Sequence, residues 1–314
     1  MAIPIKTAVI TGGASGIGLA VAQALAARGS WDIHLLDINQ DAGAAAAASI
    51  SATFHLVDIT HYPSLGLAFQ RAYLAHHRLD FVFANAGIAQ VGSINTRHDD
   101  IGPDVPPPPS SLVLDICLTG ALSTLHLALH YFRLSPRDNA DRSLCATSSS
   151  CGLYPSYHAS TYTAAKHGVV GLTRAAAKHL WEDDRVRVNC VLPSIVRTGL
   201  MTRDEWTVYP DAMFTPLAKV VATVLMLVDG RDDAPSGETR IDGVVPGKGG
   251  VLWGEVVEIC GEKHYYREMP KYCDSLMEAV MKGTDVRVLP GEQGEREVSK
   301  VIDSGKKDAL SSAV

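Results

Sequence analysis

The sequence lacks the features that mark several large classes of protein. It has no cluster of basic residues, and its 314 residues carry a formal net charge of −6, which argues against nucleic acid as the main partner. The most apolar stretch, Val220 to Val228, is nine residues long, so we expect no membrane span. The first predicted strand begins at residue 7, which leaves no room for a signal peptide, and we expect a cytoplasmic protein.

Patterns typical of metal sites and disulfide frameworks are also absent. The six cysteines, at positions 117, 145, 151, 190, 260 and 273, form no C-x-x-C pair and no zinc-like spacing with the twelve histidines. We therefore expect reduced thiols and no metal site. The composition itself is ordinary, with 46% hydrophobic and 20% charged residues. It allows one well-buried core and an appendage.

Short apolar strands alternate with amphipathic or alanine-rich helices from residue 5 to about residue 243. We expect strands at 7–11, 32–37, 53–58, 80–84, 142–147, 186–191 and 239–242, and helices at 16–28, 40–49, 62–77, 110–132, 157–181 and 216–229. This alternation predicts an α/β fold, a Rossmann-type, doubly wound parallel sheet with helices on both faces. Residues 1–243 would form this domain. Residues 244–314 would form a partly ordered C-terminal extension, with a short helix at 270–282 and a disordered end.

A glycine-rich turn, Gly12-Gly-Ala-Ser-Gly16-Ile-Gly18, joins the first expected strand to the first helix. Gly12 permits the tight turn, Gly16 lets the backbone approach a pyrophosphate, and Gly18 lets helix and strand pack closely. Free N–H groups at the helix start would face the phosphates. The turn therefore predicts a dinucleotide site.

The second expected strand ends in an acid, Asp37, nineteen residues after Gly18. A carboxylate at that point accepts hydrogen bonds from the adenosine ribose and repels a 2′-phosphate. The spacing favours NAD over NADP. A strand-end aspartate that only caps a turn is the alternative.

Tyr162 and Lys166 lie four residues apart in a predicted helix, so a phenol and an ammonium group share one face. A phenol has a reference pKa of about 10. A nearby cation lowers that pKa and makes tyrosine usable as a general acid or base. Ser149, thirteen residues before Tyr162, ends a predicted strand and could place a hydroxyl at the same spot. For such a pair by itself, a solvated helix face is the alternative.

Several separated motifs occur in a fixed order along the chain. They are Thr11-Gly-x-x-x-Gly16-x-Gly18, Asp58 after the third strand, Asn85-Ala-Gly87 after the fourth, Ser149, Tyr162-x-x-x-Lys166, and Pro193 with Thr198 after the sixth. With them, roughly residues 5–243 resemble the short-chain dehydrogenase/reductase family. Within it, the chain looks most like the branch that contains 15-hydroxyprostaglandin dehydrogenase and fungal enzymes of secondary metabolism. The resemblance implies an NAD-dependent oxidoreductase that interconverts a secondary alcohol and a ketone.

The resemblance also implies a role for each matching residue. Tyr162 would be the general acid/base, Lys166 would hold the nicotinamide ribose and lower the pKa of Tyr162, and Ser149 would donate a hydrogen bond to the substrate oxygen. The implied cofactor contacts are Gly12, Ser15, Gly16, Ile17, Gly18, Asp37, Asp58, Ile59, Asn85, Ala86, Gly87, Tyr162, Lys166, Val196 and Thr198. Asp58 would bind the adenine amino group, and Val196 and Thr198 would hold the carboxamide.

The sequence departs from the family pattern at two positions. Cys117 replaces an asparagine that usually supports a water-linked proton path toward the lysine, and Ser194 replaces a glycine. A thiol is a weak hydrogen-bond partner and cannot copy an amide. Cys117 is either tolerated with slower proton exchange, or it marks a protein without net redox turnover, such as an isomerase, a cyclase or an NAD-binding regulatory protein. At Ser194, a positive φ would add a modest strain.

The stretch after Pro193 is apolar and aromatic, and in the family it forms a flap over the substrate. It contains Ile195, Leu200, Met201, Trp206, Tyr209, Met213 and Phe214. This character favours a hydrophobic alcohol or ketone, such as a terpenoid, a polyketide or a lipid, although core packing is the alternative. Small residues in the helix at 157–181 suit close helix contact, and the resemblance implies a homodimer or homotetramer.

Overall fold

The computed structural model describes residues 5–136, 142–201, 203–232 and 251–285. The chain divides into two compact units, Met1–Arg267 and Glu268–Val314. The first unit contains every residue singled out for cofactor binding or catalysis.

In the described part of the first unit, eight strands form one sheet with the order β3-β2-β1-β4-β5-β6-β7-β8. The strands are β1 (Lys6–Thr11), β2 (Trp31–Asp37), β3 (Thr53–Leu56), β4 (Phe81–Ala84), β5 (Arg142–Thr147), β6 (Val186–Pro193), β7 (Val256–Cys260) and β8 (Lys263–Tyr266). Strands β1 to β7 pair in parallel, and β8 pairs antiparallel to β7. The predicted fold class is confirmed.

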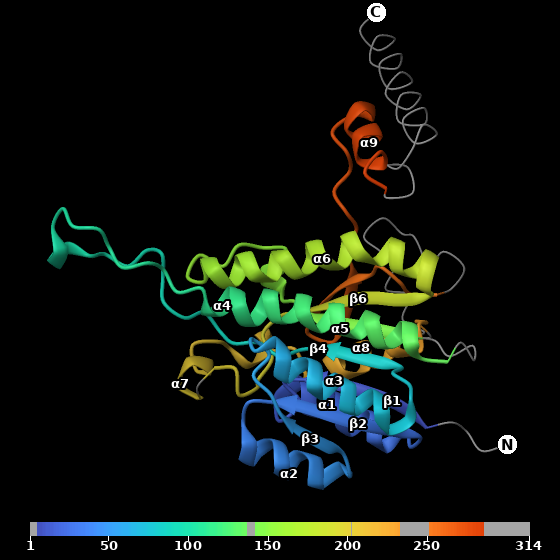
Figure 1. The fold of residues 1–314 in the computed structure, drawn as a ribbon. Coiled ribbons are helices and arrows are strands. Elements are labelled where there is room, and N and C mark those ends of the chain that lie inside the picture. Colours follow the sequence, from blue (N-terminus) through green and yellow to red (C-terminus); the bar gives the residue numbers. More distant parts are fainter. Residues whose placement is uncertain (1–4, 137–141, 202, 233–250, 286–314) are drawn as a thin grey trace, which may run out of the picture. The chain divides into compact units, whose positions relative to one another are not determined.

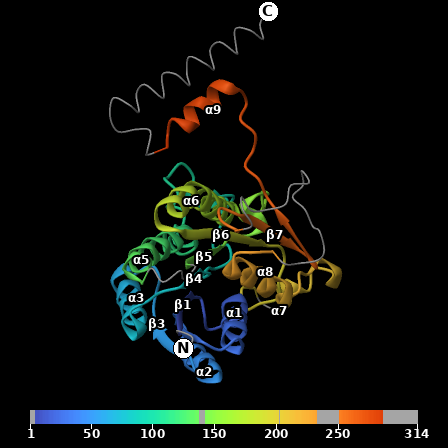
Figure 2. The same ribbon diagram turned by 90° about the vertical axis from the view of Figure 1, so that its right-hand side faces the viewer.

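Helices cover both faces of this sheet (Figures 1 and 2). The described helices of this unit are α1 (Gly16–Ala27), α2 (Gln40–Ile50), α3 (Tyr62–His76), α4 (Leu112–Leu114), α5 (Gly120–Leu134), α6 (Ser160–Asp184), α7 (Arg203–Trp206) and α8 (Leu217–Asp229). On one face α3, α5 and α6 pack side by side, and on the other α1 packs against α2 and α8. Each face therefore has its own apolar core.

The two cores follow from the alternation of side chains along the strands. In β1, Val9 belongs to the core beneath α3, α5 and α6, whereas Ala8 and Ile10 belong to the core beneath α1 and α8. Successive side chains of a strand point to opposite faces, so a strand buried on both sides is a continuous apolar run. This is why the run at residues 7–11 predicts a central strand.

The structure differs from the sequence expectations at several elements. The helix expected at 110–132 contains a π-helical segment, Asp115–Thr119, between α4 and α5. Strands β7 and β8 come from the segment expected to be an extension. The strand expected at 239–242 and the boundary expected after residue 243 lie outside the described residues.

The second unit contributes one described helix, α9 (Ser275–Lys282). It begins later than the expected residue 270, because Asp274 is its N-cap and accepts a hydrogen bond from the Met277 N–H at 2.8 Å. Lys282 and Glu278 form an ion pair within it.

Two helical segments of the described chain, Leu112–Leu134 and Asp211–Asp229, are apolar and long enough to cross a membrane by composition alone. The sequence predicts a helix at each of these places, at 110–132 and 216–229, and no membrane span. Both contribute to the cores of the first unit, through residues such as Leu125 in α5 and Val224 in α8. Core helices have the same composition, so length and hydropathy are weak grounds for a span.

A buried histidine pair lies beneath α3, where β2 and β3 pair. His34 Nδ1 and His55 Nε2 are 2.9 Å apart, and His34 Nε2 lies 3.2 Å from an Asp32 carboxylate oxygen that His76 also contacts. Burial, reinforced by His34 and Arg71, lowers the pKa of His55 to about 4. Burial also lowers the pKa of His34. The folded protein therefore favours a neutral His55.

We expect this pair to make the fold sensitive to acid. Since the pKa of His55 is lower in the folded chain than in an unfolded chain, its contribution to stability is present above about pH 6.5 and is lost as the pH falls toward 4. The loss should reach up to about 3 kcal/mol. Denaturant unfolding at a series of pH values measures it in the wild type, in His55→Gln, and in a control at the exposed His158, His158→Gln. If His55→Gln kept the full pH dependence of the wild type, His55 would not be its source.

Candidate active site

The residues singled out in the sequence gather at the carboxyl edge of the parallel strands. Gly12, Asp37 and Asn85 lie at the ends of β1, β2 and β4, and Ser149 and Thr198 follow β5 and β6. β1 lies between β2 and β4, so the strand order reverses direction there. In open α/β sheets such a switch point leaves a crevice where ligands bind.

The glycine turn is closely packed between β1 and α1. A Cβ on Gly18 would lie 2.2 Å from the Gly12 carbonyl oxygen, so no side chain fits at that point. Gly16 has a φ of +54°, and a Cβ on it would lie 3.3 Å from Thr198 Cβ. Ser15, the N-cap of α1, makes no side-chain capping bond. Since no side chain caps them, the first N–H groups of α1 can donate hydrogen bonds to an anion such as a pyrophosphate.

Asp37 is held against this turn. One carboxylate oxygen accepts a hydrogen bond from the Ala14 N–H and the other from the Asn39 N–H, both at 3.0 Å. A carboxylate oxygen can accept more than one hydrogen bond. Asp37 therefore does more than cap a turn, because its fixed negative charge also lies beside the glycine loop.

A hydrogen-bond network links the glycine turn to Lys166. The Asn85 amide donates to the carbonyl oxygens of Thr11 and Gly12, at 3.3 and 3.4 Å, and accepts from the Thr147 hydroxyl at 3.0 Å. The Thr147 carbonyl accepts from Lys166 Nζ at 2.9 Å. Asn85 therefore bridges the ends of β1 and β5, and its side chain has both a donor and an acceptor role.

Tyr162 and Lys166 occupy the first two turns of α6, and Lys166 is 3% exposed. The Lys166 ammonium lies 5.4 Å from the centre of the Tyr162 ring. The Ser149 hydroxyl accepts a hydrogen bond from the Cys151 N–H and also bonds the Tyr162 phenol. The pair is not a solvated helix face. The structure brings phenol, ammonium and hydroxyl together, with Lys166 buried and Tyr162 and Ser149 partly buried.

The pKa of Tyr162 differs from the expectation. Burial raises it above its usual value, against a smaller lowering by the Ser149 hydrogen bond. Burial also lowers the pKa of Lys166. Removal from water disfavours the charged form of each group, the phenolate of Tyr162 and the ammonium of Lys166. The side chains described here therefore hold the phenol protonated at neutral pH.

Cys117 lies in the π-helical segment and is fully buried. Its thiol accepts a hydrogen bond from the Ile88 N–H at 3.4 Å and donates to the Ile88 carbonyl at 3.5 Å. A Cβ on Gly87 would lie 3.4 Å from Cys117 Sγ and 3.6 Å from Lys166 Nζ, so the thiol and the ammonium both lie next to Gly87. The thiol thus ties the loop after β4 to this helix, next to the lysine.

The remaining predicted cofactor residues border the same edge. Asp58 is exposed, and hydrogen bonds from Thr60 lower its pKa. Ile59 and Val196 are buried in the two cores, so they would present backbone rather than side-chain atoms. A Cβ on Gly12 would lie 2.9 Å from Ala86 Cα, which places Ala86 against the glycine turn. Ser194 does not have a positive φ, and the strain considered for it does not arise.

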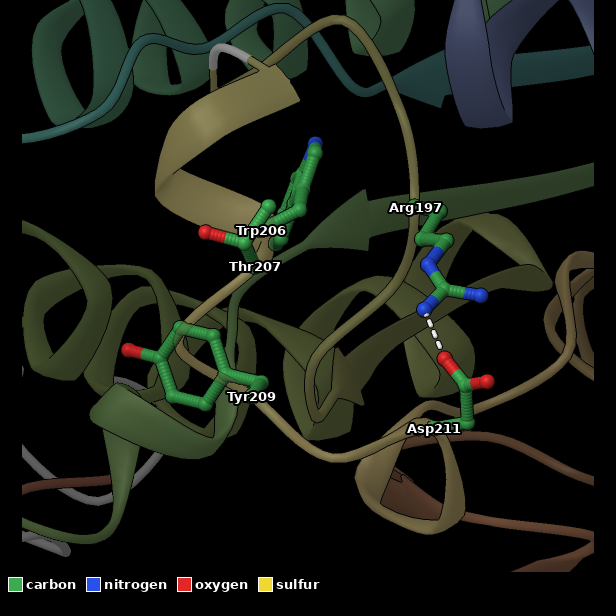
Figure 3. A pocket seen from close by; sticks show the side chains of 5 residues that line it. All are labelled: Arg197, Trp206, Thr207, Tyr209 and Asp211. Carbon is green, nitrogen blue, oxygen red and sulfur yellow. Dashed lines mark hydrogen bonds and ion pairs between the residues drawn. The ribbon is translucent and has the colours of Figure 1, made fainter.

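A pocket of about 510 Å³ lies in the segment after β6 (Figure 3). Figure 3 shows Arg197 and Asp211 joined by an ion pair on one side, and Trp206, Thr207 and Tyr209 on the other. Phe214 makes T-shaped ring contacts with Trp206 and Tyr209, and the Arg197 guanidinium lies over its ring, 3.9 Å from the ring centre. The pocket does not include Ser149 or Tyr162. Thr198 connects it to the glycine turn, because Trp206 Nε1 donates to the Thr198 carbonyl at 3.2 Å.

Sequence reasoning missed Thr147, and it named Thr11 only as the first residue of the glycine motif, without a role in the network. Thr147 ends β5 and Thr11 ends β1, where the Thr11 hydroxyl accepts from the N–H groups of Asn85 and Ala86. The sequence signal that they share is a threonine as the last residue of an apolar strand. Strand ends are where parallel sheets place their polar sites.

Comparison with known proteins agrees with this geometry. Residues 6–207 match the family model for short chain dehydrogenases. The chain is 40% identical over 275 residues to short-chain dehydrogenase/reductase prx7 of Penicillium rubens, an alignment that covers 86% of this chain and 96% of that protein. It is 34% identical over 213 residues to 5′-hydroxyaverantin dehydrogenase of Dothistroma septosporum, covering 62% of this chain and 69% of that one.

Among solved structures, the fold is similar to the crystal structure of levodione reductase. The TM-score is 0.60 with 23% sequence identity, and the match covers 72% of this chain and 92% of that chain. At this identity the similarity concerns the fold alone.

Proposed function

Because the chain belongs to the short-chain dehydrogenase/reductase family, we propose that it is an NAD-dependent oxidoreductase that interconverts a secondary alcohol and a ketone. The observation that carries the proposal is the group of Ser149, Tyr162 and the buried Lys166 beside the switch point of the sheet. The relatives named above are fungal dehydrogenases and reductases, which supports oxidation or reduction of a secondary metabolite.

The residues at the switch point fit a dinucleotide. The glycine turn and the N-terminus of α1 would hold the pyrophosphate, and Asp37 would accept hydrogen bonds from the adenosine ribose. Neither residues 11–18 nor residues 37–42 contain a lysine or arginine that would pair with a 2′-phosphate. The charge at this position therefore supports NAD over NADP. Asp58, Asn85, Val196 and Thr198 would complete the site.

The proposed chemistry depends on proton transfer at the Tyr162 phenol oxygen. Bound NAD would accept a hydride during alcohol oxidation and return it during ketone reduction. In oxidation, ionised Tyr162 takes the substrate's hydroxyl proton while Ser149 donates a hydrogen bond to the same oxygen; in reduction, the phenol donates. Since burial raises the pKa of Tyr162, reduction is favoured at neutral pH and oxidation as the pH rises.

We propose that the substrate is a hydrophobic small molecule, such as a terpenoid, a polyketide or a lipid. Trp206, Tyr209 and Phe214 form an aromatic group around the pocket after β6, and its contact with Thr198 links it to the cofactor site. Aromatic side chains offer large apolar surfaces. The Arg197–Asp211 pair at the opposite side offers a donor and an acceptor for a polar substituent.

A protein without net redox turnover is the alternative suggested by Cys117. The thiol is bonded to the Ile88 backbone, and Ser149, Tyr162 and Lys166 remain grouped beside it. This arrangement favours the oxidoreductase. We further propose a cytoplasmic homodimer or homotetramer. In place of the expected domain of residues 1–243, we propose a catalytic domain that also includes β7 and β8 and ends at Arg267, with the remaining residues as its extension.

Tyr162→Phe should abolish most turnover while NAD still binds. The change removes the proton donor and keeps the ring, so kcat should fall at least about 100-fold. NADH absorbance with a panel of secondary alcohols and ketones measures turnover, and calorimetric titration measures NAD affinity. Tyr157→Phe, at a tyrosine that is 82% exposed, is the matched control. A Tyr162→Phe variant with near-normal rates would overturn the assignment.

Asp37→Ala should weaken NAD binding and relax discrimination against NADP. The variant loses a ribose acceptor and the charge that repels a 2′-phosphate, so the NAD dissociation constant should rise about 10-fold, as expected for one charge-assisted hydrogen bond. Titration of both cofactors against wild type and variant tests this. A wild-type preference for NADP would refute the role given to Asp37.

A further inference from the structure

Helix α6, which carries Tyr162, begins without a local cap. Its N-cap residue is Ala159, which has no side chain able to accept a hydrogen bond. The first N–H of the helix to bond within its own turn is that of Thr163, which donates to the Ala159 carbonyl at 2.8 Å. The N–H groups before it, including that of Tyr162, need acceptors from elsewhere.

Gln90 supplies that acceptor from the loop after β4. Its side-chain carbonyl oxygen accepts a hydrogen bond from the Tyr162 N–H at 2.8 Å, across 72 residues of sequence. Its amide nitrogen donates to the carbonyl oxygens of Val91 and Gly92, at 3.2 and 2.9 Å. A flipped amide would lose all three bonds, so this network fixes the orientation of the side chain.

The loop that carries Gln90 is itself attached close to the catalytic lysine. Ile88, two residues earlier, makes both of its backbone hydrogen bonds with the buried Cys117 thiol. After this loop the chain leaves the body of the first unit as an extended segment that returns at α4 (Figure 1). In this segment Ile94 is 64% exposed and Val105 is 92% exposed. Gln90 therefore bonds the loop to α6 just before the extended segment begins.

Tyr162 and Lys166 are held in comparable ways. Lys166 is fixed at both ends, because its Nζ donates to the Thr147 carbonyl and its own carbonyl accepts from the Ser148 hydroxyl at 2.8 Å. One turn earlier, Gln90 fixes the backbone of Tyr162. The position of the phenol relative to the ammonium depends on both attachments, since a shift of the first turn of α6 would move the phenol away from Ser149.

We infer that Gln90 is a positioning residue for Tyr162, a remote helix cap that keeps the phenol in register with Ser149 and Lys166. The inference rests on the proposed function, in which Tyr162 transfers the proton. Small displacements of a catalytic group cost large factors in rate. Gln90 acts through the backbone of Tyr162 and is not expected to contact the cofactor or the substrate.

Two substitutions separate this role from simple packing. Gln90→Met keeps the length of the side chain and removes the acceptor. We expect kcat for alcohol oxidation to fall about 10-fold and the NAD dissociation constant to stay within about twofold. The ascending limb of the pH–rate profile, where the oxidation rate rises as Tyr162 ionises, should shift. Gln90→Glu keeps an acceptor oxygen, which the start of a helix favours, and should retain at least about threefold more activity than Gln90→Met. Ile94→Ala, in the exposed segment, is the control.

The outcomes distinguish the inference from the proposed function. A Gln90→Met variant with kcat within about twofold of wild type, or equal losses in Gln90→Met and Gln90→Glu, would overturn the role of Gln90 while Tyr162→Phe remained inactive. If Tyr162→Phe kept wild-type rates, the proposed function itself would fail. A loss confined to thermal stability, with an unchanged pH–rate profile, would also contradict the positioning role.

Discussion

The hydrogen bond between the buried Lys166 ammonium and the Thr147 carbonyl is the constraint on which the site depends. A cation in a buried position needs partners, and the end of β5 supplies one. Thr147 in turn engages Asn85, and Asn85 engages the carbonyl oxygens of the glycine turn. The proposed catalytic helix and the proposed cofactor loop are thus parts of one hydrogen-bonded framework. This framework holds Lys166 of α6 at the ends of β1 and β5.

Within that framework, burial decides the ionisation of Tyr162. The phenol and the ammonium lie close together, yet removal from water outweighs the hydrogen bond from Ser149 and raises the pKa of the phenol. A further positive charge above the ring would shift the balance toward phenolate. We propose that bound NAD supplies it, so that the tyrosine ionises only when its cofactor is in place.

The fold followed from the sequence more fully than the site did. Apolar runs that end at Thr11, Asp37 and Thr147 predict parallel strands, because local pattern and burial agree there. The gathering of Gly12, Asp37, Ser149 and Tyr162 at one edge follows from the same topology. The π-helical turn at Cys117 and the cap from Gln90 do not follow, since each depends on a contact between distant segments. The direction of the Tyr162 pKa shift likewise depends on burial, which spacing alone does not give.

Direct titration of the Tyr162 phenol addresses the central claim without knowledge of the substrate. The absorbance difference between wild type and the phenylalanine variant isolates this one group, with and without saturating NAD. The account predicts a phenol that titrates above the usual value of about 10 in the free protein and at a distinctly lower pH once NAD is bound. A phenol that titrates at its ordinary value in both states would contradict it.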